Sequence, residues 1–251
     1  MLIHPTLDNM RALRLFAMAQ ALETQMSMKD IEEINFTDRL GLLVDAELIA
    51  RENKRLQSRL KNAKLRLSAC IEDLDIKAAR GLDRNVIAAL ATSDWLKSHQ
   101  NVIVTGPTGA GKTYIACALA QKACRDGFTT FYERATSLFQ ELALAKVDGR
   151  YNKIMAGFAK KDLLVIDDFA LVPLNDEQRR DLLEIVEERY NRRSTLIASQ
   201  IPSEHWYDII GDPTIADAIL DRIIHNAHKL SIKGESRRKP KEKTSNNGNE
   251  K

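Results

Sequence analysis

The first eighty residues carry the hydrophobic pattern of helices. Thr6 can cap a first helix that runs to about Met26, and Thr37-Asp38 can begin a second one. From residue 42 to about residue 74 the chain has no Pro or Gly, and apolar residues recur at intervals of seven, four, three and four. This spacing predicts a long amphipathic helix whose apolar stripe consists of Ile49, Leu56, Leu60, Ala63 and Leu67.

The pattern changes at Arg80-Gly81, where we expect a domain boundary. Beyond it, helical stretches alternate with short apolar segments that predict strands, namely residues 102–105, 129–132, 163–166, 195–199 and 229–232. Such alternation predicts an α/β fold with a parallel five-stranded sheet flanked by helices. The last residues, 240–251, are Lys, Asn, Ser, Glu and Gly with one Thr and one Pro, so we expect a disordered basic tail.

The loop after the first predicted strand fits the phosphate-binding pattern G-x-x-x-x-G-K-[ST]. Its glycines let backbone N–H groups turn toward an anion, and the N-terminal end of the next helix adds positive charge. We expect Lys112 to reach the β- and γ-phosphates and the Thr113 hydroxyl to hold Mg²⁺. A strand precedes the loop and a helix over 114–126 follows it, ending at Gly127, so a nucleoside triphosphate site is predicted. The loop consists of Gly106, Pro107, Thr108, Gly109, Ala110, Gly111, Lys112 and Thr113.

Polar residues end the third and fourth predicted strands. Asp167 and Asp168 close the third strand, where Asp167 is expected to hold Mg²⁺ through water and Asp168 to orient or deprotonate the attacking water. Gln200 follows the fourth strand, where it would position water or sense the γ-phosphate, unless it is an ordinary strand terminus. The chain has no N-K-x-D motif for guanine. ATP with Mg²⁺ is therefore the predicted cofactor pair.

Composition indicates a soluble globular protein, because 44% of the 251 residues are hydrophobic and 29% are charged. We see neither an apolar run of about 18 residues nor the apolar core of a signal peptide, so no membrane partner is expected. The three cysteines cannot all pair. Cys117 and Cys124 lie seven apart on the helix after the phosphate loop and are expected to be buried, which favours a reducing, cytoplasmic location.

Positive charge is concentrated in two runs. Residues 51–66 hold seven Lys/Arg and one Glu, and residues 233–251 hold seven Lys/Arg and three Glu, whereas the whole chain carries only +3. Each run alone would ordinarily be a solvated face or tail, but two of them favour a polyanionic partner, with nucleic acid first. Arg51, Arg55 and Arg59 would stack on one helix face and repel one another, so acidic neighbours or DNA phosphates must compensate.

In their order along the chain, these motifs resemble the IstB family of AAA+ ATPases, the helper proteins of insertion-sequence transposition, which are related to the DnaC helicase loaders. The resemblance covers almost the whole chain. It rests on A-R-E-N-K-R-L-Q-S-R-L (50–60), R-G-L-D-R (80–84), the phosphate loop, L-L-V-I-D-D-F (163–169), A-S-Q-I-P (198–202), D-R-I-I-H-N-A-H-K-L (221–230) and G-E-S-R-R-K (234–239).

The resemblance implies a P-loop AAA+ domain over 81–239, preceded by a small all-helical domain over 1–80 for DNA or partner binding and assembly. It also implies that Arg222 is an arginine finger acting on a neighbouring subunit of a homo-oligomer, and that Arg238, with Arg237 as an alternative, is a second sensor. Residues 134–161 resemble an extra helical insertion facing DNA. There Lys146, Arg150 and Lys153 would share one helix face, although Gly149 argues against a continuous helix.

The function implied is ATP-dependent assembly on duplex DNA with little sequence preference, recruitment or stimulation of a partner transposase, and disassembly on hydrolysis. Most AAA+ proteins have Asp-Glu where this chain has Asp167-Asp168, which favours a switch-like ATPase over a fast one. The alternative is a helicase loader of the DnaC kind, in which the helical domain grips a helicase.

Overall fold

A computed structural model describes residues 5–75 and 81–234 of the chain. It divides into two compact units, residues 1–58 and 59–251, and a helix passes from the first unit into the second. The expected boundary at residue 80 does not coincide with this division, because Ala69, Ile71 and Leu74 are buried in the core of the second unit. A functional division at residue 80 stays a prediction.

The first unit consists of helices α1 (Pro5–Ala12), α2 (Phe16–Ser27), the short η1 (Ile31–Glu33) and most of α3 (Phe36–Ala63). The single helix expected from Thr6 to Met26 is wrong, since Arg14 has a left-handed φ of 59° and separates α1 from α2. A carboxylate oxygen of Glu47 on α3 accepts the N–H groups of Ala17 and Met18, at 2.9 and 3.1 Å. Glu47 therefore caps α2, whose own N-cap residue makes no side-chain cap.

The long helix α3 ends earlier than its apolar stripe predicts. It stops at Ala63, and Lys64 turns the chain with a φ of 52°, so the helix expected to reach residue 74 is wrong. Residues 65–75 instead form an irregular segment with one short turn, η2 (Ile71–Asp73). This segment packs against α6 (Lys112–Arg125), the helix that follows the phosphate loop.

The second unit contains the expected parallel five-stranded sheet. Its strands are β1 (Asn101–Thr105), β2 (Thr130–Arg134), β3 (Leu163–Phe169), β4 (Ser194–Ser199) and β5 (Ala227–Ser231), in the order β2-β3-β4-β1-β5. All four pairings are parallel. Because β4 lies between β1 and β3, the loops after these three strands meet at one edge of the sheet.

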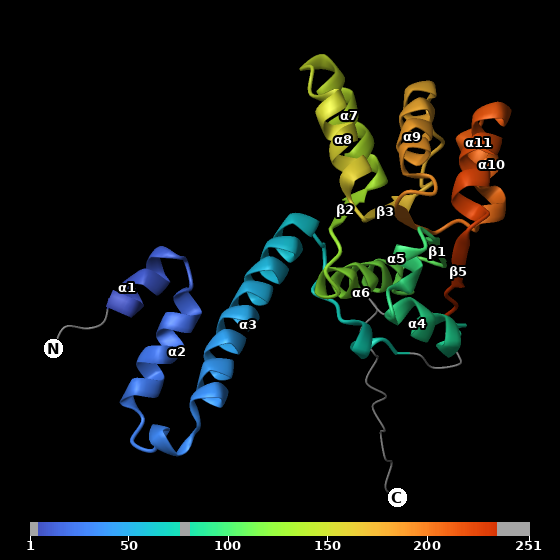
Figure 1. Ribbon diagram of the computed structural model, residues 1–251. Coiled ribbons are helices and arrows are strands. Elements are labelled where there is room, and N and C mark those ends of the chain that lie inside the picture. Colours follow the sequence, from blue (N-terminus) through green and yellow to red (C-terminus); the bar gives the residue numbers. More distant parts are fainter. Residues whose placement is uncertain (1–4, 76–80, 235–251) are drawn as a thin grey trace, which may run out of the picture. The chain divides into compact units, whose positions relative to one another are not determined.

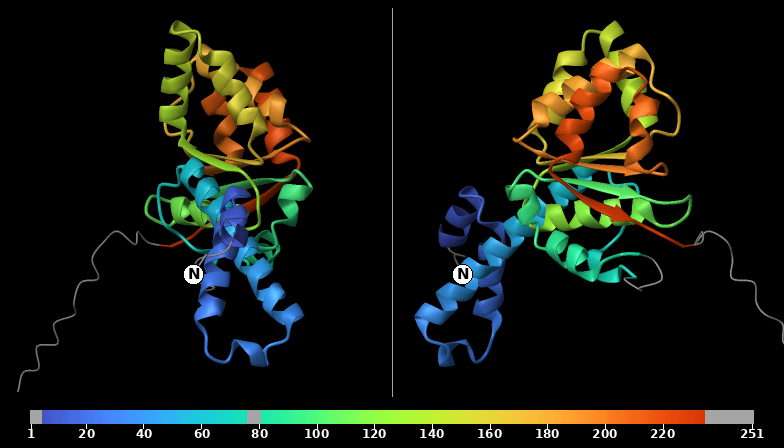
Figure 2. Two further views of the ribbon diagram at one scale, coloured as in Figure 1. Left: turned by 60° about the vertical axis from the view of Figure 1, so that its left-hand side comes forward. Right: turned by 90° about the vertical axis from the view of Figure 1, so that its right-hand side faces the viewer.

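Helices cover both faces of this sheet (Figures 1 and 2). Val102 and Val104 of β1 point into a core with α6, whereas Ile103 points into the core on the other face. One face carries α4 (Arg84–Ala91), α5 (Asp94–Lys97) and α6; the other carries α7 (Ala135–Val147), α8 (Tyr151–Lys160), α9 (Asp176–Arg189), α10 (Trp206–Ile210) and α11 (Pro213–Ile224), with η4 (Ser203–His205) before α10.

The expectation for two of the cysteines is confirmed in the second unit. Cys117 and Cys124 are both fully buried on α6, as expected, and burial raises the pKa of each thiol. Within residues 5–75 and 81–234, no helix combines the length and apolar character needed to cross a membrane. The basic tail expected at 240–251 lies outside the described residues.

Candidate nucleotide-binding site

The phosphate loop connects the end of β1 to the start of α6. Three of its glycines have positive φ angles, of 153° at Gly106, 80° at Gly109 and 104° at Gly111. At Gly106 a Cβ would lie 2.5 Å from the carbonyl oxygen of Ile232, so no other residue fits without moving the backbone after β5. The Lys112 ammonium donates to the carbonyls of Gly106 and Pro107, at 2.8 and 3.0 Å, and so lies folded over the loop.

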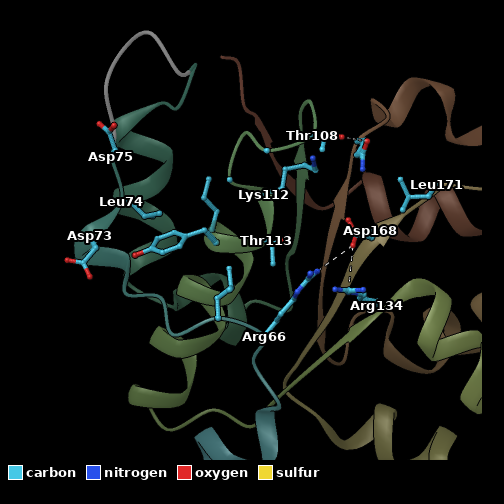
Figure 3. Close-up of a pocket in the computed structure, with 16 residues that line it drawn as sticks. Arg66, Asp73, Leu74, Asp75, Thr108, Lys112, Thr113, Arg134, Asp168 and Leu171 are labelled. Atoms are coloured by element: carbon cyan, nitrogen blue, oxygen red, sulfur yellow. Dashed lines mark hydrogen bonds and ion pairs between the residues drawn. The ribbon is translucent and has the colours of Figure 1, made fainter. Parts of the chain in front are cut away.

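A cavity of about 570 Å³ opens beside this loop. Leu74 lies with Asp73 and Asp75 on one side of the cavity, whereas Arg66, Arg134 and Asp168 gather on the other side, next to the loop and the end of β3 (Figure 3). Leu67, Tyr114 and Ile115 add apolar surface to the lining. A nucleotide likewise joins a largely apolar base to an anionic phosphate chain, and the cavity offers apolar surface as well as cations beside the loop. The lining of the cavity comprises Arg66, Leu67, Asp73, Leu74, Asp75, Thr108, Gly109, Gly111, Lys112, Thr113, Tyr114, Ile115, Arg134, Asp168, Leu171 and Gln200.

Asp167 is fully buried under the loop and is held by two hydroxyls. Thr113 donates its hydroxyl to Asp167 Oδ2 at 2.7 Å, and Tyr132 on β2 donates to the same oxygen at 2.7 Å. Burial and this carboxylate raise the pKa of Tyr132, so the phenol stays protonated and keeps donating. A threonine hydroxyl beside a carboxylate is a donor set that suits Mg²⁺, and the two residues expected to hold the metal are therefore together.

Asp168 differs from its neighbour because β3 has a bulge. The pairing of β3 with β4 shifts by one residue between Ile166 and Phe169, and Asp168 has a left-handed φ of 54°. The bulge turns the Asp168 side chain into the cavity, where its Oδ2 lies 3.8 Å from Arg66 Nη1 and 3.8 Å from Arg134 Nε (Figure 3). Consecutive aspartates thus face different surroundings, one buried and one in the cavity.

Gln200 lies where its position after β4 predicts. It lines the cavity with the phosphate loop and Asp168, and its side-chain oxygen accepts the Thr108 hydroxyl at 2.6 Å. The side chain is thereby fixed to the loop at the edge where phosphates would enter. A role in positioning water or sensing the γ-phosphate stays a prediction.

Arg222 lies near the opposite end of β1 from the phosphate loop. Asn101, the first residue of β1, donates its side-chain amide to the carbonyls of Arg222 and Ile223, both at 3.1 Å. The loop follows the last residue of that strand, roughly 13 Å farther along it. The Arg222 guanidinium contacts the Ala218 carbonyl at 2.8 Å and Glu187 at 3.1 Å. Among the described residues, neither partner lines the cavity. Arg238 and its alternative Arg237 lie outside the described residues.

The basic residues expected on α3 have different surroundings. Arg51 donates to Glu47 at 2.8 Å, which supplies the acidic neighbour that a row of arginines requires. Arg59 donates to the carbonyl of Cys124 at 2.8 Å and is half-buried. Arg55 is exposed and, in the part of the chain that the structure describes, forms no ion pair. A role of these three residues in binding DNA stays a prediction.

The insertion between β2 and β3 is helical but not continuous. Lys146 belongs to α7, Arg150 is the N-cap of α8, and Gly149 with a φ of 77° breaks the chain between them. The prediction that Lys146, Arg150 and Lys153 share one helix face is therefore wrong. Lys146 binds the buried Asp181 at 2.6 Å, Arg150 binds Asp148 at 2.7 Å, and Lys153 is exposed.

Sequence reasoning missed three residues of the site. Tyr132 and Arg134 belong to β2, and Arg134 is the register partner of Asp167, so its place at the end of a strand was a usable signal. Arg66 was counted in the basic run 51–66. The sequence gives no sign that Arg66 lines the cavity, because its position depends on where α3 ends.

Comparison with known proteins agrees with this geometry. A family model described as IstB-like ATP binding protein matches residues 8–245. An insertion-sequence ATP-binding protein of Sinorhizobium fredii is 47% identical over 239 residues, covering 95% of this chain and 98% of that one. One from Pseudomonas fluorescens is 44% identical over 204 residues, covering 81% and 88%.

Solved structures share the fold. The DnaC helicase loader matches with a TM-score of 0.56 at 20% identity, covering 68% of this chain and 100% of that chain. The replication initiator DnaA bound to AMPPCP and single-stranded DNA also has a TM-score of 0.56, at 17% identity, covering 68% and 52%. The second unit therefore has the P-loop AAA+ fold expected from the sequence. With the family model spanning nearly its whole length, the chain belongs to the family of IstB-like ATP-binding proteins.

Proposed function

We propose that this protein is a switch-like ATPase that assembles with copies of itself on duplex DNA when ATP is bound, recruits or stimulates a partner transposase, and disassembles after hydrolysis. The observation that carries the proposal is the hydrogen bond between Thr113 and the buried Asp167, beside a phosphate loop and a cavity of about 570 Å³. These residues would hold Mg²⁺ and the phosphates, and the bound metal would neutralise charge that develops on the γ-phosphate.

The site's own residues divide the remaining work. Lys112 would leave the Gly106 and Pro107 carbonyls to bind the β- and γ-phosphates. Asp168 would orient the attacking water, and Gln200, tied to Thr108, would hold that water or the γ-phosphate in place. Tyr132 would keep the Asp167 carboxylate facing Thr113.

Assembly is part of the proposal because Arg222 lies near the far end of β1 from its own phosphate loop. An arginine there would complete the site of a neighbouring copy, so that hydrolysis depends on the oligomer. The names of the relatives support a role in transposition, since they are insertion-sequence ATP-binding proteins. The exposed Arg55 and Lys153 would add backbone contacts to DNA, which carry little sequence information.

Fluorescence anisotropy of labelled duplex and single-stranded DNA tests this function, with ATP, ADP or no nucleotide. We expect tight duplex binding only with ATP, weakened steeply by salt, and loss of the ATP effect in Lys112→Ala. Equal duplex binding with ATP and ADP would contradict the proposal. A preference for single strands, or no DNA binding at all, would favour the helicase-loader alternative.

A further inference from the structure

Arg66 approaches the nucleotide cavity from a segment that sequence reasoning assigned to DNA binding. It follows the end of α3 by three residues and lies in the second unit, whereas the basic row of α3 begins in the first. The backbone amides of Arg66 and Leu67 contact the thiol of Cys117 on α6. Cys117 follows Thr113 by one helical turn. Its backbone is therefore fixed beside the residue expected to hold Mg²⁺.

The guanidinium of Arg66 faces the Tyr132 hydroxyl and the Asp168 carboxylate. Its side chain is 36% exposed, and its contact with Asp168 Oδ2 is an ion pair of 3.8 Å, longer than a hydrogen bond. Arg134 approaches the same oxygen at the same distance (Figure 3). Two cations thus share one carboxylate oxygen, and a closer anion with several oxygens would attract either of them.

The cavity has room for such an anion between these groups. Arg66, Lys112, Thr113 and Asp168 all line it, so a phosphate chain that enters over the loop would bring its last phosphate toward Asp168. A γ-phosphate there would also be repelled by Asp168 unless a cation lay between them. The planar fork of an arginine can bind phosphate through two N–H groups, which a distant carboxylate contact does not use.

We propose that Arg66 is a γ-phosphate ligand supplied from within the same chain, and that it distinguishes ATP from ADP by moving from Asp168 to the phosphate. The inference rests on the proposed function and deepens it, because Asp168 becomes available to orient water only when ATP is bound. ADP has no γ-phosphate, so with ADP the guanidinium stays on Asp168.

Calorimetric binding of a non-hydrolysable ATP analogue and of ADP, with Mg²⁺, tests this role in the full-length chain. In Arg66→Ala we expect affinity for the ATP analogue to fall roughly 10-fold to 100-fold, the loss typical of a charge-assisted contact, with ADP affinity nearly unchanged. Arg66→Lys keeps the charge without the fork and should give a smaller loss. Lys61→Ala is the matched control, since Lys61 is an exposed cation of the same basic run, and should change neither affinity.

The inference would be overturned if Arg66→Ala and Arg66→Lys left both nucleotide affinities unchanged. Equal losses of affinity for the ATP analogue and for ADP would overturn it as well. So would a loss of duplex binding in Arg66→Ala with its preference for ATP over ADP intact, because that result would return Arg66 to the DNA-binding run. A wild-type protein that binds neither nucleotide overturns the proposed function as well. A wild-type protein that distinguishes ATP from ADP through Arg66 but binds no DNA overturns only the proposed function.

Discussion

Substitution of Arg222 separates a structural role from a catalytic one by the size of the effect. Within its own chain, the Arg222 guanidinium pairs with Glu187, which is 49% exposed, and lies 5.9 Å from the Tyr190 ring. A surface ion pair, an exposed cation–π contact and the hydrogen bond to the Ala218 carbonyl each contribute about 1 kcal/mol, so Arg222→Ala should lower the free energy of unfolding by no more than about 3 kcal/mol. An arginine finger instead accelerates hydrolysis about 10³-fold to 10⁵-fold, or roughly 4–7 kcal/mol of barrier.

The assay measures phosphate release under conditions that give assembly, for Arg222→Ala and for the control Arg192→Ala. Arg192 is exposed and likewise pairs with a glutamate, Glu188, at 3.8 Å, so it reports a generic loss of a surface arginine. We expect Arg222→Ala to bind ATP with unchanged affinity and to lose at least about 10³-fold in rate. Hydrolysis within a factor of a few of wild type would refute the finger.

A mixture of two inactive variants tests whether the finger acts between copies. Asp168→Asn keeps Arg222 but loses the group expected to orient water, and Asn tolerates the left-handed backbone found at Asp168. In an equal mixture with Arg222→Ala, about a quarter of head-to-tail contacts join an intact site to an intact finger, so activity should return to about a quarter of wild type. No recovery at any ratio, in assemblies shown to contain both variants, would contradict action between subunits.

Three further predictions follow from single contacts. Arg189 is 1% exposed, and burial lowers its pKa to about 9. Because it donates to the carbonyls of Phe158, Lys161 and Ser194, Arg189→Met should lower the free energy of unfolding by about 3 kcal/mol or more in urea titrations. The hydrogen bond from Arg51 lowers the pKa of Glu47 from its ordinary value. The Glu47 carboxylate should therefore stabilise α2 at neutral pH and lose this effect in acid, as pH falls through the lowered pKa. Amide exchange in the first turn of α2 should show this loss, and Glu47→Gln should remove the pH dependence. In Gly106→Ala the added Cβ would clash with the backbone after β5, so ATP affinity should fall sharply in calorimetry.

The sheet and the loops that carry phosphate chemistry could be predicted from the sequence because local patterns determine them. All five strands occur within three residues of their predicted bounds, since most of them contain a short apolar run bounded by polar residues. The helical part was harder, because α1 and α2 are separated by a left-handed Arg14 rather than by Pro or Gly. Likewise, α3 ends at Ala63 because the following residues pack on α6, a tertiary contact with no local signal.

The site shows the same limit at the level of side chains. Asp167, Thr113 and Gln200 could be assigned places because each follows directly from a strand end or from the phosphate loop. The different surroundings of Asp167 and Asp168 depend on a bulge in β3, which appears only when β3 is paired with β4. The spacing of the insertion's basic residues was misleading, because it assumed one helix where Gly149 separates two.

The two proposed arginines would make hydrolysis conditional in different ways. Arg66 belongs to the same chain as the phosphate loop, so it would respond to the nucleotide alone, whereas Arg222 would respond to the presence of a neighbour. If both are required, ATP binding alone frees Asp168 but leaves the site without its second arginine. The ATP-bound form then persists until copies assemble, which is the order of events that assembly on DNA before hydrolysis requires. Slow hydrolysis by the unassembled protein is a necessary consequence of the Arg222 role. A fast ATPase rate at dilutions where only monomers exist would therefore contradict that role and leave the role of Arg66 standing.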